Sequence, residues 1–135
     1  MTAQSQARSL DEMEGKQGVA PVKGSTTIWQ GALVVSESGL AIPGKTAASG
    51  LTILGVAEET VKNTGADGAL KVPFRRGVFK FFNLGADAVV AGDVGKDCYL
   101  VDDQTVAKTS NTNAHSVAGK VIAVESDGVF VRVGY

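Results

Sequence analysis

The chain is poor in the residues that most often carry chemistry, since its 135 residues include one cysteine and one histidine. The single thiol, Cys98, excludes an intrachain disulfide and any zinc site built from several cysteines. The single histidine, His115, lies in a polar stretch at residues 109–116, where we expect it to be exposed and away from any nucleophile. The residue types therefore favour no catalytic mechanism, and we expect the protein not to be an enzyme.

Strong net charge and long apolar runs are also missing. The formal net charge is -1, so no overall field attracts nucleic acid or an anionic membrane. No run approaches the ~20 apolar residues that a membrane span needs. Asp93, Asp97, Asp102 and Asp103 lie close in sequence but lack the spacing of a calcium-binding loop. We expect no cofactor, no metal site, no nucleic-acid partner and no membrane association.

Glycine, in contrast, is abundant, with seventeen glycines against three prolines. Turn residues repeatedly interrupt short apolar or alternating runs, a pattern typical of successive β-strands. The runs are at residues 26–29, 32–35, 40–43, 53–57, 70–74, 78–82, 98–101, 105–108, 118–125 and 129–133. The sequence therefore predicts an all-β fold, a small barrel or sandwich of about ten short strands.

Local features refine this prediction. Ser126-Asp127-Gly128 joins the last two runs and indicates a tight hairpin. Residues 83–92 are the only plausible helical interval, so we expect at most one short helix. Pro73 cannot donate a ladder hydrogen bond, which predicts an edge strand or a bulge there.

Residues 1–18 differ from the rest of the chain because polar and charged residues dominate them. Leu10 and Met13 are their only sizeable apolar side chains. Such a segment buries too little apolar surface to offset its ordering entropy, so it is either disordered or ordered against a partner. We expect an N-terminal arm at residues 1–18 and a single β-rich domain at residues 19–135.

Basic and aromatic residues alternate around Gly77, in what the sequence predicts to be a hairpin with a positive tip. The basic residues are Lys71, Arg75, Arg76 and Lys80, and the aromatic residues are Phe74, Phe79, Phe81 and Phe82. Such a pattern can bind single-stranded nucleic acid, but the favoured interpretation places aromatics in the core and basic groups toward water or a protein. If Phe79 and Phe81 face the core, alternation exposes Phe82 on the outer face, as in many subunit contacts.

The order of turn motifs along residues 20–133 resembles a family of tailed-bacteriophage capsid decoration, or cement, proteins. The motifs lie at residues 24–28, 31–34, 39–43, 55–57, 63–68, 76–79, 86–87, 93–95, 98–106, 118–119 and 127–129. The arm departs from the family, because Asp11, Glu12 and Glu14 stand where a basic, proline-containing segment is common.

This resemblance implies a structural protein on the outer surface of the virion capsid, made in the host cytoplasm. It implies binding to the major capsid protein, bridging of neighbouring capsid subunits and self-association as a homotrimer. The candidate capsid or subunit contacts are Leu10, Met13, Trp29, Arg75, Arg76 and Phe82. Two alternatives remain: a β-barrel binding module for carbohydrate or single-stranded nucleic acid, and a small β-rich enzyme using His115 or the acids at residues 93–103.

Overall fold

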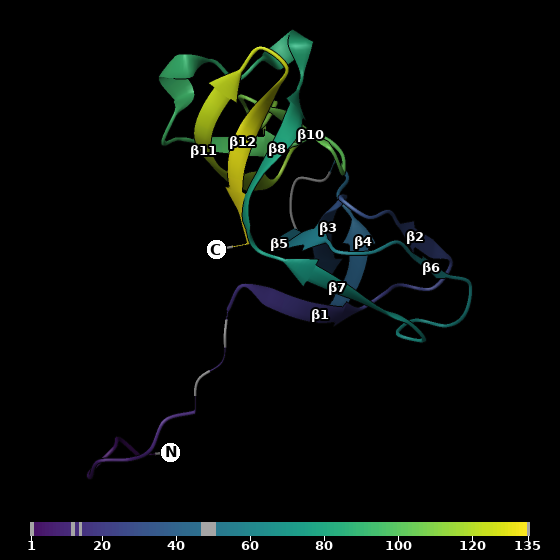
Figure 1. The fold of residues 1–135 in the computed structure, drawn as a ribbon, viewed down its shortest axis with the longest axis vertical. Coiled ribbons are helices and arrows are strands. Elements are labelled where there is room, and N and C mark those ends of the chain that lie inside the picture. The colour runs from purple at the N-terminus through teal and green to yellow at the C-terminus, as the bar shows by residue number, and fades with distance from the viewer. Residues whose placement is uncertain (1, 12, 14, 47–50, 135) are drawn as a thin grey trace.

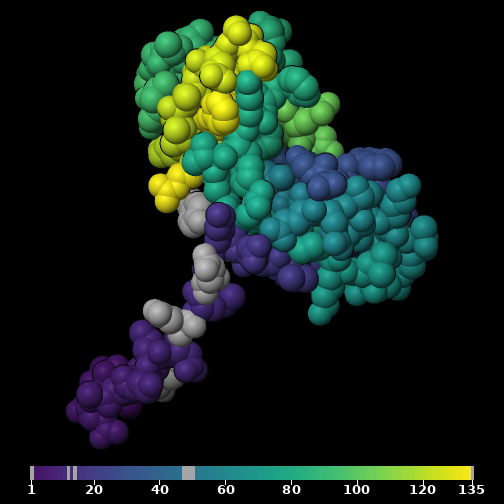
Figure 2. Space-filling view, viewed as in Figure 1, coloured from purple at the N-terminus to yellow at the C-terminus, as the bar shows by residue number. Residues whose placement is uncertain are grey.

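A computed structural model describes residues 2–11, 13, 15–46 and 51–134. These residues form two β lobes, and the N-terminal arm leads away from both (Figures 1 and 2). The described residues contain twelve strands and two single-turn 3-10 helices, η1 (Gly85–Asp87) and η2 (Ala91–Asp93). The all-β prediction is confirmed, and the helix expected within residues 83–92 is reduced to these two turns.

The first lobe, called here the sheet lobe, is a five-stranded antiparallel sheet with a two-stranded ribbon beside it. The sheet order is β1 (Gln17–Pro21), β7 (Lys71–Arg75), β5 (Leu51–Ala57), β3 (Leu33–Glu37) and β4 (Leu40–Pro43). The ribbon pairs β2 (Thr26–Ile28) with β6 (Val61–Asn63). Ile28, Val34, Val72 and Phe74 belong to the apolar cluster of this lobe.

The second lobe is a closed barrel of five strands. Their order is β10 (Thr105–Ala107), β8 (Gly77–Asn83), β12 (Gly128–Val133), β11 (Val117–Glu125) and β9 (Asp97–Leu100). The hairpin predicted at Ser126-Asp127-Gly128 is confirmed, because β11 and β12 pair up to Glu125 opposite Gly128. On β8, alternation buries Phe81 and leaves Phe82 59% exposed, as the sequence predicts.

Strand β3 connects the two cores because both of its faces are buried. Leu33 and Val35 join a cluster with the barrel residues Leu100 and Val131, whereas Val34 between them packs into the sheet lobe. Alternation along one strand therefore supplies both lobes. This shared packing fixes the surface where the lobes meet.

Two expectations for residues 70–82 are wrong. Strands β7 and β8 form no hairpin, because β7 pairs with β1 and β5 while β8 belongs to the barrel, and the chain passes between lobes at Arg76. Strand β7 is also neither an edge strand nor bulged at Pro73, because it lies between β1 and β5 and Pro73 is opposite Val19 in regular register, although β5 ends beside Pro73. The Pro73 carbonyl accepts a hydrogen bond from the Glu58 N–H, just beyond that end.

Candidate functional site

Three of the six candidate contact residues gather where the lobes meet. Trp29, Arg75 and Phe82 each line one of three adjoining hollows, and Gly31 lines all three. The hollow beside Trp29 has a volume of about 430 Å³, and the one beside Phe82 about 340 Å³. We call the surface formed by these two hollows the junction site.

The first wall of the junction site is a tight turn at residues 29–32. The Ala32 N–H donates to the Trp29 carbonyl at 3.0 Å, and Gly31 has a φ of 87°, which glycine adopts without strain. The turn is fastened to the sheet lobe by the Gly31 N–H, which donates to the Ala57 carbonyl at 2.9 Å. The Gln30 N–H donates to Thr60 Oγ1 at 3.0 Å, so the turn is also bonded to a residue outside it.

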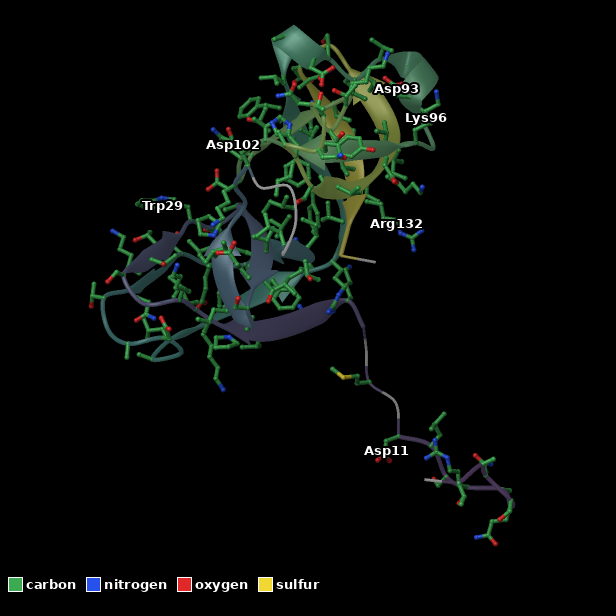
Figure 3. All side chains as sticks on the ribbon, turned by 180° about the vertical axis from the view of Figure 1, so that it is seen from behind. Asp11, Trp29, Asp93, Lys96, Asp102 and Arg132 are labelled. Atoms are coloured by element: carbon green, nitrogen blue, oxygen red, sulfur yellow. The ribbon has the colours of Figure 1, made fainter. Side chains whose placement is uncertain are left out.

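The second wall is the turn at residues 102–104, which is bonded to both lobes. The Gln104 N–H donates to Asp102 Oδ1 at 2.9 Å and closes the turn. The Asp103 carbonyl accepts from the Leu33 N–H at 2.8 Å, and the Gln104 carbonyl accepts from the Phe82 N–H at 2.8 Å. Figure 3 shows Trp29 and Asp102 on the same side of the molecule, one on each lobe. The two walls are therefore preorganised by backbone bonds.

The side chains of the junction site combine exposed aromatic rings with polar groups. Trp29 is 56% exposed, with Lys62 Nζ 5.1 Å from its ring centroid, and Phe82 is 59% exposed. Burial raises the pKa of the Asp103 carboxyl, and the negative charge of Asp102 raises it further. Within the described residues, no side-chain hydrogen bond or ion pair engages Gln30 or Gln104, and the Asp103 carboxylate accepts only from its own backbone N–H. Three polar side chains with bonding capacity to spare thus line the same hollows as two aromatic rings.

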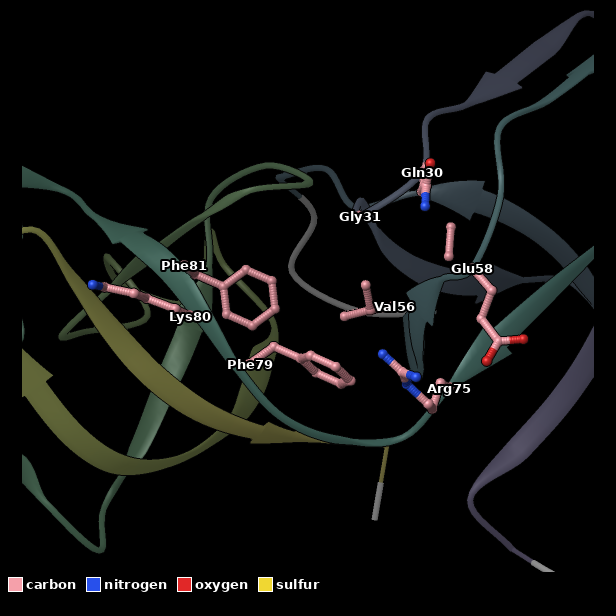
Figure 4. Close-up of a pocket in the computed structure, with 9 residues that line it drawn as sticks. Gln30, Gly31, Val56, Glu58, Arg75, Phe79, Lys80 and Phe81 are labelled. Atoms are coloured by element: carbon pink, nitrogen blue, oxygen red, sulfur yellow. The ribbon is translucent and has the colours of Figure 1, made fainter.

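The third hollow, of about 550 Å³, is lined by residues of both lobes and is shown in Figure 4. Arg75 and Phe79 face each other across it, with the guanidinium carbon 5.6 Å from the ring centroid. Glu58 lies on the same side as Arg75, and Lys80 lies on the barrel side. Lys80 is bound to Asp127 and to Glu125, so its charge is already compensated.

Arg76 lies apart from this surface, at the root of the arm. Its Nη1 donates to the Gly15 carbonyl at 2.6 Å, its N–H donates to the Lys16 carbonyl at 2.7 Å, and its guanidinium carbon lies 5.1 Å from the centroid of the Phe74 ring. The predicted positive tip is therefore divided between two surfaces. Leu10 and Met13 are 69% and 83% exposed on the arm.

The structure does not bring the remaining reactive groups together into a site. Burial raises the pKa of the Cys98 thiol to about 12. His115 is half-buried, which corrects the expectation that it is exposed, and its Nδ1 has no hydrogen-bond partner among the described residues. Within the same residues, no three His, Cys, Asp or Glu side chains gather as a metal site.

The four acids at residues 93–103, which lack calcium-loop spacing, serve mostly local structure. Asp93 accepts from the Val90 N–H at 2.8 Å, and Asp97 binds Lys120 at 2.9 Å. Asp102 closes its own turn, as described above. Of these four acids, Asp103 is the one that lines the junction site, and nothing in its sequence context distinguishes it from the other three.

Sequence reasoning did not place Gln30, Gly31, Asp103 and Gln104 in this site, and it considered Asp103 only as one of four neighbouring acids. The two turns were visible as breaks between strands, but their approach depends on long-range hydrogen bonds. Comparisons of the chain with protein families, curated proteins and solved structures find no match. No helix in the described residues is long and apolar enough to cross a membrane.

Proposed function

We propose that this protein is a capsid decoration, or cement, protein of a tailed bacteriophage. In this role it binds the outer surface of the head and bridges neighbouring major capsid protein subunits. The proposal is supported by the resemblance over residues 20–133 together with the all-β fold. The observation that carries it furthest is an exposed arm fixed at its root to a rigid β body.

The arm has the properties of a segment that orders on a partner. Leu10 and Met13 are its exposed apolar side chains, and the arm leads away from both lobes (Figure 2). Burying both on a capsid surface would contribute about 1.5–3 kcal/mol for each side chain before ordering costs. Arg76 fixes the point where the arm leaves the body, so the arm reaches the shell from a defined origin.

Many copies acting together would stabilise a shell even if each contact is weak, because every copy holds subunits that would otherwise separate. In a closed ring of identical copies, every subunit makes the same contacts. We propose that this protein forms such a ring of three copies, a homotrimer. Trp29 and Phe82 remain candidates for contacts between the copies or with the shell. This assignment is independent of the arm.

The arm is tested by deleting residues 2–14, which keeps Gly15 and Lys16 for their contacts with Arg76. Binding is measured by co-sedimentation with expanded heads, stripped of this protein, from the phage that encodes the chain. We expect the deletion to reduce occupancy while the thermal unfolding midpoint stays unchanged. A Leu10→Ala/Met13→Ala variant should reproduce most of the loss, and Val94→Ala, an exposed barrel residue, is the matched control.

Two results would contradict the proposal in different ways. If the full-length protein fails to bind heads at all, the capsid role is wrong. If the deletion variant binds as well as the full chain, the body alone carries the contact and the arm proposal is wrong.

A further inference from the structure

We propose that the junction site binds a neutral carbohydrate, held between Trp29 and Phe82. This goes beyond the capsid role, and it does not depend on that role. It assigns the two exposed aromatic rings to a glycan, in place of the subunit or shell contact considered above.

The aromatic rings supply the apolar half of such a site. Sugar rings carry patches of C–H groups that pack on aromatic faces, and large rings contribute contact area with little loss of side-chain freedom. Lys62 Nζ lies over the Trp29 ring, 5.1 Å from its centroid, and Trp29 is still 56% exposed, so it has surface available to a ligand. Phe82 is 59% exposed across the same pair of hollows.

The polar half comes from Gln30, Gln104 and Asp103. An amide both donates and accepts hydrogen bonds, and a carboxylate accepts them, so the set complements sugar hydroxyl groups, which do both. Gln30 and Gln104 are exposed, and no side-chain hydrogen bond or ion pair within the described residues engages them. Asp103 is half-buried, and a hydrogen bond from its own backbone N–H leaves further acceptor capacity on its carboxylate. A few polar groups beside aromatic rings are what a small-ligand site requires.

The dimensions and rigidity of the site fit a small ligand. The hollows of about 340 and 430 Å³ adjoin at Gly31 and Gln104, and each lies in the range of ligand sites, about 300–1,000 Å³. A Cβ added at Gly31 would meet no atom within 4 Å, so the backbone there is open to a ligand. Because the two turns are fixed by backbone hydrogen bonds, binding would not need to order them.

The charges favour a neutral glycan over nucleic acid. Asp103 and Asp127 line the hollows, and Lys80 is already paired with Asp127 and Glu125. Phosphate groups would therefore meet two carboxylates against the single charge of Lys62, which lies over the Trp29 ring. A single-stranded oligonucleotide is the ligand that this lining disfavours.

Trp29 is the only tryptophan of the chain, so its fluorescence reports directly on the junction site. The full-length protein is titrated with dextran, galactomannan and chitohexaose, and separately with heparin and oligo-dT. We expect a saturable change with at least one neutral glycan at concentrations up to about 10 mM, within the range of weak binding. Heparin and oligo-dT should give none.

Variants inside and outside the junction site test whether the change in Trp29 fluorescence comes from this site. Phe82→Ala and Asp103→Asn should each weaken glycan binding about tenfold or more, a difference of about 1.4 kcal/mol. Ile122→Ala, at an exposed apolar position on β11 outside the hollows, is the matched control and should bind normally. Circular dichroism establishes that each variant is folded, and Gln104→Ala replaces any variant that is not.

Four results would overturn the inference. The first is the absence of a fluorescence change with every neutral glycan, the second is a saturable change with oligo-dT or heparin that Phe82→Ala abolishes, and the third is glycan binding that the variants leave intact. The fourth comes from sedimentation velocity: if Phe82→Ala converts an oligomer into monomers, these rings form a subunit contact. Head binding is measured separately, so failure here and failure of the capsid role are distinguishable.

Discussion

Replacing Arg76 by alanine should loosen the root of the N-terminal arm without opening either lobe. The substitution removes the hydrogen bond from Nη1 to the Gly15 carbonyl at 2.6 Å and the contact with the Phe74 ring. A hydrogen bond to a charged group contributes about 1.5–3 kcal/mol, and an exposed cation–π contact about 0.5–1 kcal/mol. Arg76 is half-exposed, so we take a lower figure for the sum, about 2 kcal/mol.

A loss of about 2 kcal/mol corresponds to about a thirtyfold increase in the population of the released arm root. Hydrogen–deuterium exchange measures this directly on peptides that cover β1, which follows the arm and pairs with β7. We expect faster exchange there and unchanged exchange in the barrel strands. The backbone bond from the Arg76 N–H to the Lys16 carbonyl survives the substitution and limits the effect to the side chain.

Arg75→Ala is the matched control, because it removes a neighbouring arginine that contacts Phe79 and not the arm. It should leave exchange in β1 close to that of the unaltered protein. Equal exchange of β1 in the Arg76 and Arg75 variants would refute the view that the Arg76 side chain anchors the arm.

Three further predictions concern the two lobes. Gly119→Ala should destabilise the protein by about 1–3 kcal/mol in urea unfolding, since a Cβ would overlap the backbone of β12, whereas Gly92→Ala meets open space and should have a much smaller effect. Cys98 should stay unmodified by iodoacetamide in the native protein at pH 8 and react after unfolding, because burial raises its pKa to about 12; native labelling would contradict this. The Thr109 hydroxyl holds the pKa of the Asp87 carboxyl below 3.8, so the associated stability is present above that value and lost as pH falls through the lower folded pKa. Titration by NMR should show a higher midpoint in Thr109→Val, and an unchanged midpoint would refute the assignment.

Strands and local hairpins were predictable because their determinants are close in sequence. The hairpin of β11 and β12 follows from Asp127-Gly128 between two apolar runs, and the pair β3 and β4 follows in the same way from its turn. The alternation of side chains along β8 correctly predicted that Phe82 is exposed. These features depend on two or three residues of local chemistry.

The partition into two lobes was not predictable, because it depends on pairings between distant residues. Gly77 was interpreted as a hairpin turn, yet it begins the strand that enters the barrel. Strand β8 pairs with β12 and, in parallel, with β10, neither of which adjoins it in sequence. A glycine between two strands marks a change of direction but does not determine whether the strands pair with each other.

The junction site shows the same limit at the level of function. The exposure of Phe82 was predicted from the alternation along its strand, whereas Trp29 was a candidate contact only through the family resemblance. Asp103 and Gln104 were not assigned to a contact surface, because their role depends on bonds from Leu33 and Phe82 that no local pattern encodes. Alternation can therefore identify one exposed ring of the site, whereas its polar residues require the fold.

Arg75 and Arg76 explain why the two proposed surfaces are compatible in one molecule. Consecutive residues leaving a strand direct their side chains to opposite sides, and here Arg75 faces the hollow with Phe79 while Arg76 faces the arm at Gly15. The arm root and the third hollow, which adjoins the junction site, are therefore built from neighbouring residues but use different faces. An arm ordered on a shell would not need Trp29 or Phe82, so a copy held by its arm retains a junction site free to bind a glycan.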